Sequence, residues 1–132
     1  MKRIFVIACC AILLISCHEN LEDRAAREAK EYTEKFCPTP VNNFTRTDSV
    51  VFEKDTKTYH YYCTLTGLMD NLDIITMHQK EIHDALAKSI KESTNINAYK
   101  EAGFNFEYTC RSEKNSKLIL FQAIYSSKDY NK

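Results

Sequence analysis

Gly103-Phe104-Asn105-Phe106-Glu107-Tyr108-Thr109-Cys110 is the clearest structural pattern in this chain of 132 residues. Apolar side chains occupy positions 104, 106, 108 and 110, and polar ones stand between them. Successive side chains of a β-strand point to opposite faces of a sheet, so this alternation predicts a strand with one buried face. A polar turn at residues 112–116 leads into a second strand at 118–125, which completes a hairpin.

A second hairpin is predicted upstream of this one. Residues 49–53 and 58–65 are rich in β-branched and aromatic side chains, and the polar stretch Lys54-Asp55-Thr56-Lys57 separates them. Two sets of side chains alternate in the second strand: Tyr59, Tyr61, Cys63 and Leu65 with His60, Tyr62 and Thr64. We expect the first set to face the core.

Helical periodicity appears in two longer segments. Residues 21–36 carry one apolar stripe at steps of three and four, namely Leu21, Ala25, Ala29, Tyr32 and Phe36. Residues 72–93 predict a second amphipathic helix, with Asp73 as its N-cap. A short helical turn follows and ends at Gly103.

The predicted fold class is therefore α+β. Its element order is αββαββ, with a four-stranded antiparallel sheet packed on one face by helices. We expect a single domain over residues 21–127, because the chain is too short for two hydrophobic cores, and a frayed C-terminus at 128–132.

The N-terminus has the layout of a bacterial secretory signal. Lys2-Arg3 precedes an apolar run of about twelve residues, which is shorter than the roughly 20 that a membrane-spanning helix needs. The run ends in Leu14-Ile15-Ser16-Cys17, which resembles the signal of bacterial lipoproteins, whose cysteine receives acyl chains. This predicts a signal peptide at 1–16 and a lipidated Cys17 with a short tether at 17–20. The alternative is an ordinary signal peptide that contains cysteines.

The lipoprotein hypothesis also predicts a location. His18, next to Cys17, is not the aspartate that resembles an inner-membrane retention signal, so the outer membrane of a bacterial envelope is favoured. The 116 residues after the leader hold 16 Lys and Arg against 18 Asp and Glu, a formal charge of −2. Because the charges are mixed and show no basic stripe, the sequence argues against a nucleic-acid partner.

Three motifs resemble a family of small, largely uncharacterised exported bacterial lipoproteins of Bacteroidetes type. They are Thr45-Arg46-Thr47-Asp48, Tyr59-His60-Tyr61 and Gly103-Phe104-Asn105-Phe106-Glu107-Tyr108. The first motif departs from the family at Thr47, where a leucine is typical. The resemblance implies the order helix, hairpin, helix, hairpin, and it implies no activity.

The domain retains three cysteines, Cys37, Cys63 and Cys110, so at most one intramolecular disulfide can form. Cys63 and Cys110 both lie on predicted inward faces. They form either a disulfide or two buried thiols, and Cys37 is expected to be the more exposed. No local pattern pairs a cysteine with a histidine for nucleophilic catalysis.

No metal or cofactor site is predicted. His78 and His83 are five residues apart, which places them about 140° apart around a helix rather than on one face. The chain has only two glycines, too few for a glycine-rich phosphate loop. We therefore predict no catalytic residues, no metal and no cofactor.

The favoured function is a non-enzymatic, membrane-anchored envelope lipoprotein that binds another protein, as a subunit, inhibitor or immunity factor. Its expected binding face is the helix-free side of the sheet, with Tyr62, His60, Thr64 and Arg111. The alternative is a small hydrolase or carrier for envelope glycans or lipids, which would use the apolar space between helices and sheet as its pocket.

Overall fold

Four strands form one sheet in the order β1-β2-β3-β4. The computed structural model describes residues 19–131, and its strands are β1 (Thr45–Glu53), β2 (Thr58–Leu65), β3 (Asn105–Ser112) and β4 (Ile119–Tyr125). The pairs β1–β2 and β3–β4 are antiparallel, which confirms both predicted hairpins. β2 and β3 are parallel, so the sheet is mixed and the prediction of a purely antiparallel sheet is wrong.

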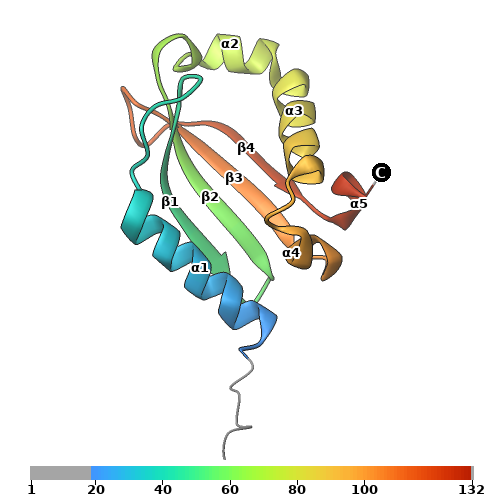
Figure 1. The fold of residues 1–132 in the computed structure, drawn as a ribbon. Coiled ribbons are helices and arrows are strands. Elements are labelled where there is room, and N and C mark those ends of the chain that lie inside the picture. Colours follow the sequence, from blue (N-terminus) through green and yellow to red (C-terminus); the bar gives the residue numbers. More distant parts are fainter. Residues whose placement is uncertain (1–18, 132) are drawn as a thin grey trace, which may run out of the picture.

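The connection from β2 to β3 explains the parallel pairing. It contains a short 3-10 helix, η2 (Gly67–Met69), and the helices α2 (Leu72–Met77), α3 (Gln79–Glu92) and α4 (Asn97–Glu101). α2 lies at one end of the sheet, and α3 runs back toward the other end (Figure 1). The chain therefore enters β3 at the end where β2 began. Parallel neighbours require a crossover of this kind.

The helix predicted over residues 72–93 is in fact two helices. The chain bends at His78, whose φ of −107° and ψ of 17° fall outside the α-helical region. A straight helix of that length would span about 33 Å, whereas the bend turns α3 along the sheet. The N-cap is Asn71 rather than the predicted Asp73, because the Asn71 side chain accepts hydrogen bonds from the backbone N–H groups of Asp73 and Ile74.

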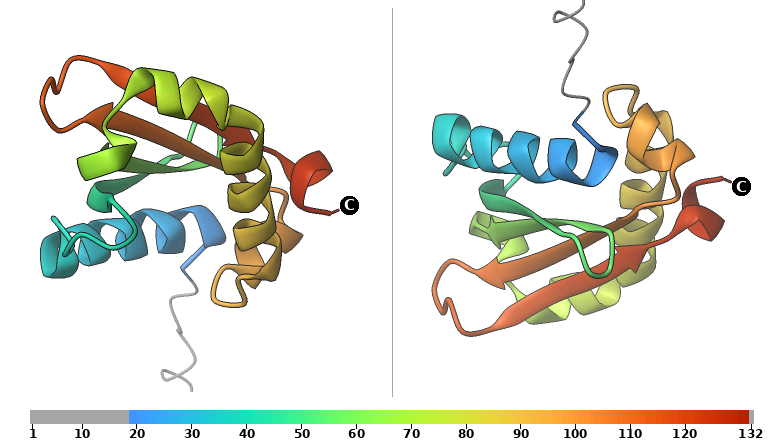
Figure 2. Two further views of the ribbon diagram at one scale, coloured as in Figure 1. Left: turned by 90° about the horizontal axis from the view of Figure 1, so that it is seen from above. Right: turned by 90° about the horizontal axis from the view of Figure 1, so that it is seen from below.

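Helix α1 (Leu21–Phe36) has its predicted bounds and lies along the edge strand β1 (Figure 2). Ala25 and Ala29 are its buried residues. Near its end, the Thr33 hydroxyl accepts a hydrogen bond from the backbone N–H of Val50 at 2.8 Å and donates one to the Val50 carbonyl at 2.9 Å. α1 thus satisfies backbone groups that an edge strand would otherwise expose.

The buried side chains form two apolar clusters on the helical side of the sheet. The larger cluster is Ala25, Ala29, Val50, Phe52, Tyr59, Ile90, Tyr99, Phe104, Phe106, Tyr125 and Tyr130. The smaller one is Cys63, Leu65, Ile75, Cys110, Leu120 and Phe121. The β2 set predicted to face the core belongs to these clusters or packs against them, which confirms the strand alternation.

The C-terminus is folded rather than frayed. Residues 127–130 form the short helix α5 (Ser127–Tyr130), which begins with a capping box between Ser126 and Asp129. Tyr130 is 2% exposed, and its hydroxyl donates a hydrogen bond to the Phe104 carbonyl at 2.8 Å. Burial of one aromatic ring and a local cap thus order a segment whose sequence is polar.

Gly67, at the start of η2, has a φ of +56°, and a Cβ there would lie 3.0 Å from Phe44 Cδ1. Gly103 has a φ of +77°, and a Cβ there would meet no atom within 4 Å. Left-handed backbone costs about 1–2 kcal/mol for other residues. We expect Gly67→Ala and Gly103→Ala each to lower the free energy of unfolding by that amount in urea denaturation, with the larger loss at Gly67.

The excess loss at Gly67 is attributed to the Phe44 ring, so it should disappear in the Phe44→Ala background. Equal losses at the two glycines in the wild-type background would show instead that the exposed Phe44 ring moves aside without cost.

Candidate functional site

An apolar groove lies on the helical side of the sheet, between α1 and α3. Figure 1 shows α1 beside β1 and α3 on the other side of the molecule, with the middle strands between them. The groove contains a cavity of about 410 Å³. It is lined by Asn43, Thr45, Thr47, Cys63, Leu65, Met69, Ile75, Ile82, Ala85, Leu86, Tyr108, Cys110 and Phe121. The side chains from α2 and α3 in this lining, Ile75, Ile82, Ala85 and Leu86, are all apolar.

Two further hollows lie beyond this cavity. Thr45 and Thr47 also line a hollow of about 620 Å³ with Tyr32 and Phe36 of α1. Tyr32 in turn borders a third hollow of about 310 Å³, which reaches Tyr61 and the region of α4. The cavity shares Thr45 and Thr47 with the second hollow, and the second hollow shares Tyr32 with the third, so the three are neighbours in this order.

Two tyrosines form the middle of the groove floor. Tyr61 and Tyr108 are only partly buried, and their rings stack with centroids 4.8 Å apart and an interplanar angle of 12°. Burial raises the pKa of both phenols well above the ordinary value, so their hydroxyls stay protonated. Among residues 19–131 neither hydroxyl has a hydrogen-bond partner, and neither is a buried unsatisfied group. Both can therefore donate to an occupant of the groove.

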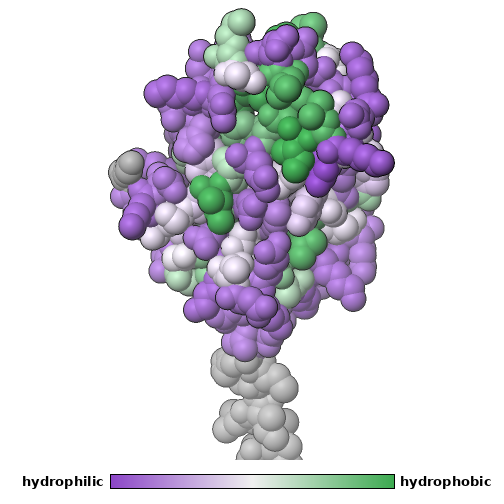
Figure 3. Space-filling view, turned by 180° about the vertical axis from the view of Figure 1, so that it is seen from behind, coloured by the Kyte–Doolittle hydropathy of each residue, from purple (hydrophilic) through white to green (hydrophobic). Residues whose placement is uncertain are grey.

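Exposed apolar side chains also gather outside the lining of the apolar cavity. Phe36, at the end of α1, is 59% exposed, and Phe44, before β1, is 44% exposed. A view from behind shows further apolar side chains gathered mainly toward the α2 end, opposite the start of α1 (Figure 3). The large exposed apolar residues of η2, α2, β4 and the turn before β4 are Leu68, Leu72, Met77, Leu118, Ile119 and Ile124.

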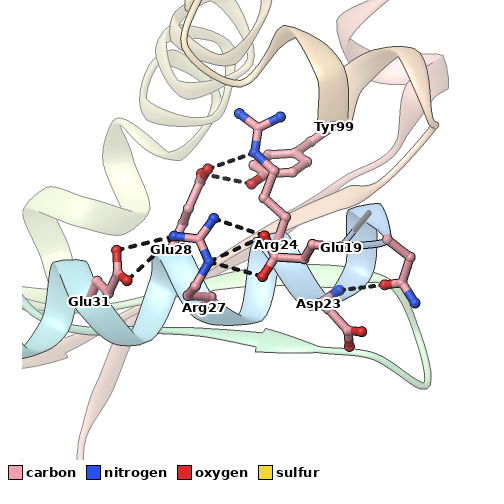
Figure 4. A network of polar contacts seen from close by, with 8 residues as sticks. Glu19, Asp23, Arg24, Arg27, Glu28, Glu31 and Tyr99 are labelled. Atoms are coloured by element: carbon pink, nitrogen blue, oxygen red, sulfur yellow. Dashed lines mark hydrogen bonds and ion pairs between the residues drawn. The ribbon is translucent and has the colours of Figure 1, made fainter. Parts of the chain in front are cut away.

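A polar network holds the α1 wall against α4 (Figure 4). Glu28 accepts hydrogen bonds from Tyr99 Oη at 2.7 Å and from Arg24 Nε at 2.7 Å, and the Arg24 guanidinium lies over the Tyr99 ring. Although burial opposes it, these two hydrogen bonds hold the pKa of Glu28 below its ordinary value. Burial, followed by the bond to Glu28, raises the pKa of Tyr99.

The remaining charges of α1 neutralise one another. Arg27 contacts Glu19 at 2.9 Å and Glu31 at 3.4 Å, and Lys30 lies 4.0 Å from Glu34. All these groups are exposed, so each pair contributes little to stability. The α1 wall therefore offers a groove occupant an apolar surface with balanced charge.

The predicted binding face lies on the opposite side of the sheet, and the polar groups of His60, Thr64 and Arg111 on it already have partners. His60 is 6% exposed, with Nδ1 3.0 Å from Glu53 Oε1 and Nε2 2.8 Å from Thr109 Oγ1. The His60 ring stacks on Tyr62 with centroids 4.0 Å apart.

The other two residues of this face are engaged as well. Thr64 is 7% exposed and is hydrogen-bonded to Asp48 and Arg46. Arg111 donates a hydrogen bond to the Ser116 carbonyl at 3.3 Å. Tyr62 and Arg111 are partly exposed, and the role of this face in binding stays a prediction.

The structure brings the two core cysteines together and leaves the helical histidines apart. Cys63 and Cys110 are register partners on β2 and β3 and are thiols, whereas His60 lies on the other face of β2. His78 is exposed beside Glu81, and the His83 ring lies against Tyr125. Within residues 19–131 no three His, Cys, Asp or Glu side chains are grouped so that they could hold a metal ion.

The predicted lipid anchor lies outside the described part of the chain, which begins at residue 19. In that part, none of the helices combines the length and apolar character needed to cross a bilayer. The sequence analysis placed Tyr61 on the core-facing side of its strand, and it predicted residues 72–93, which include Ile82 and Leu86, only as an amphipathic helix. Their partial exposure depends on the gap between α1 and α3, which has no local sequence signal.

The fold also occurs in solved structures of other proteins. A protein of Pseudomonas aeruginosa described as secreted aligns with a TM-score of 0.65 and 9% identity, over 85% of this chain and 98% of that one. The pilotin EpsS of the Vibrio vulnificus type 2 secretion system aligns at 0.62 with 10% identity, over 83% and 90% of the two chains. The Vibrio cholerae type II secretion pilotin AspS aligns at 0.60 with 12% identity, over 83% and 92%. The TM-scores show that these proteins share the fold of this chain, and the low identities limit the likeness to the fold.

The sequence also matches the model of a protein family. Residues 20–121 match the model of a domain of unknown function, DUF8479, and the chain belongs to that family. No curated protein matches the chain significantly.

The contact between α1 and α4 can be tested through one hydroxyl group. Tyr99→Phe removes the donor to Glu28 and leaves the buried ring in place. We therefore expect the free energy of unfolding, measured in urea at pH 7, to be about 1 kcal/mol lower than that of the wild type. This bond favours ionised Glu28, whose pKa is lowered on folding. The difference between wild type and variant should therefore shrink as the pH falls through the folded-state pKa of Glu28. A difference that grew toward acid pH would contradict this assignment.

Proposed function

We propose that this protein is a lipoprotein of the bacterial envelope, anchored by acyl chains on Cys17, whose domain binds a helical segment of a partner protein in the apolar groove. The observation that carries this proposal is the apolar cavity between the sheet and the helices α2 and α3, which more polar hollows along α1 adjoin. The outer membrane is the favoured location, for the reason given by the sequence around Cys17 and His18.

A helix is the occupant that best fits the geometry. One face of a sheet in an α+β domain is normally covered by a layer of helices, and here α1 and α3 cover only its two sides. An amphipathic helix with apolar side chains three and four residues apart would complete that layer. The hydroxyls of Tyr61 and Tyr108 would donate hydrogen bonds to its polar groups, and tyrosine is favoured at the centre of interfaces.

The position of the groove favours a protein partner over the bilayer. Cys17 comes four residues before Leu21, so an anchor there would hold the start of α1 near the membrane. The exposed apolar side chains lie mainly toward the opposite, α2 end of the molecule (Figure 3). The fold shared with a secreted protein and two secretion-system pilotins supports placement in the envelope.

A carrier for an apolar envelope ligand is the second candidate, favoured by one observation. The 410 Å³ cavity is within the size range of small-molecule sites, about 300–1,000 Å³. A hydrolase is less well supported, because the phenols of the groove floor stay protonated.

The anchor is tested by Cys17→Ser. Because the thiol is the site of acylation in this proposal, we expect the variant to incorporate no alkyne-labelled palmitate and to leave the membrane fraction. Cys37→Ser is the matched control and should be labelled like the wild type. Equal labelling of Cys17→Ser and wild type would contradict the lipoprotein hypothesis.

The groove is tested at Ala85, an exposed α3 residue in its lining. Ala85→Glu places a charge in the apolar groove at a helix position that tolerates it, so we expect at least a tenfold loss of partner captured by in-cell crosslinking. Gln79→Glu adds the same charge to an exposed position of α3 outside the groove, and it should bind normally. Thermal unfolding of each variant checks that the fold is retained.

The same assay separates the two faces of the sheet. If Ala85→Glu captured its partner like the wild type while a Tyr62→Ala/Arg111→Ala double variant lost it, the binding site would be the polar face and not the groove. A photo-crosslinker at position 85 should also join the partner, whereas one at position 79 should not.

A further inference from the structure

Cys63 and Cys110 face each other across the only parallel strand pair of the described sheet. They are register partners, they are 5% and 7% exposed, and both line the apolar groove. Neighbouring strands lie about 4.8 Å apart, which is within the Cα separation of about 4.4–6.8 Å that a disulfide requires.

The topology gives this pair of cysteines a particular position. Short turns join the strands of each hairpin, whereas β2 and β3 are joined by the long crossover of residues 66–104. The entropy lost on closing a loop grows with its length, so this contact is the most costly one in the sheet to form. A covalent bond between positions 63 and 110 would close that loop in the unfolded chain as well.

We propose that Cys63 and Cys110 form an intramolecular disulfide in the exported protein, which fastens the crossover, and with it the α3 wall of the groove, to the sheet. The oxidising location rests on the proposed envelope function. The pairing itself rests only on the register, the burial and the shared groove lining of the two residues.

The oxidation of the two thiols needs an oxidant, and we take this oxidant to be another disulfide. The thiolate of one cysteine attacks one sulfur of that disulfide, forms a mixed disulfide and releases the first thiolate of the oxidant. The thiolate of the other cysteine then attacks the sulfur of the first and releases the second thiolate of the oxidant. The protein loses two electrons and two protons, and the oxidant becomes two thiols.

Both thiols can be reached through the groove, because both line it. Either cysteine can therefore make the first attack, and the other then closes the bond. Burial raises the pKa of the Cys37 thiol, which lowers its reactivity.

The test uses the full-length protein, extracted from the envelope without reductant, alkylated and digested for mass spectrometry. We expect a linked peptide pair that contains Cys63 and Cys110, and an alkylated Cys37. Dithiothreitol should lower the melting temperature by an amount on the order of 10 °C. Cys37→Ser should keep this shift, whereas Cys63→Ala/Cys110→Ala should lose it.

Alkylation of all three thiols, or a bond that includes Cys37, would overturn the proposal. If the double alanine variant does not fold, two measurements still test the proposal. They are the peptide map of the wild type and the effect of dithiothreitol on the melting temperature of Cys37→Ser. Incubation of the purified, reduced chain with oxidised glutathione separates pairing from location. A Cys63–Cys110 bond there supports the pairing, and free thiols there overturn it. If the bond forms in vitro but not in the protein extracted from the envelope, the proposal fails for the exported protein. The pairing is then possible, and the assumed oxidising location is the part that is wrong.

Discussion

The parallel pairing of β2 with β3 is the constraint on which the rest of the structure depends. Two antiparallel hairpins would be complete on their own, but a parallel contact between them requires the chain to cross the sheet before β3 begins. That requirement accounts for η2, α2, α3 and α4, all of which lie in the crossover. It also places α3 on the same side of the sheet as α1, and the groove is the space that these two helices leave between them.

The two faces of the sheet differ in how their polar groups are satisfied. On the face opposite the helices, His60, Thr109 and Glu53 are linked to one another, and Thr64 is held by Asp48 and Arg46. On the groove face the floor hydroxyls of Tyr61 and Tyr108 have no partner among the described residues. A surface with satisfied hydrogen bonds gains little from an occupant, whereas apolar surface and free donors gain much more.

The fold is shared with proteins that are only 9–12% identical in sequence to this chain. Strand alternation and helix amphipathicity can be met by many different sequences, so the architecture persists while individual side chains change. The functional argument therefore rests on side chains of this chain rather than on the shared fold. They are the stacked Tyr61 and Tyr108 of the groove floor, the Cys63–Cys110 pair, and the link from Glu28 to Tyr99 that fixes α1.

The sequence by itself determined the α+β class, both hairpins, the bounds of α1 and the faces of β2 and β3, because each depends on a period of two or of three to four residues along a short segment. Only the tertiary structure decided the direction of β3 beside β2, the bend at His78 and the burial of Tyr130. The groove and the pairing of Cys63 with Cys110 across β2 and β3 were also decided only by the tertiary structure. Each of these depends on contacts between segments far apart in the chain, and a local pattern of side chains carries no information about such contacts.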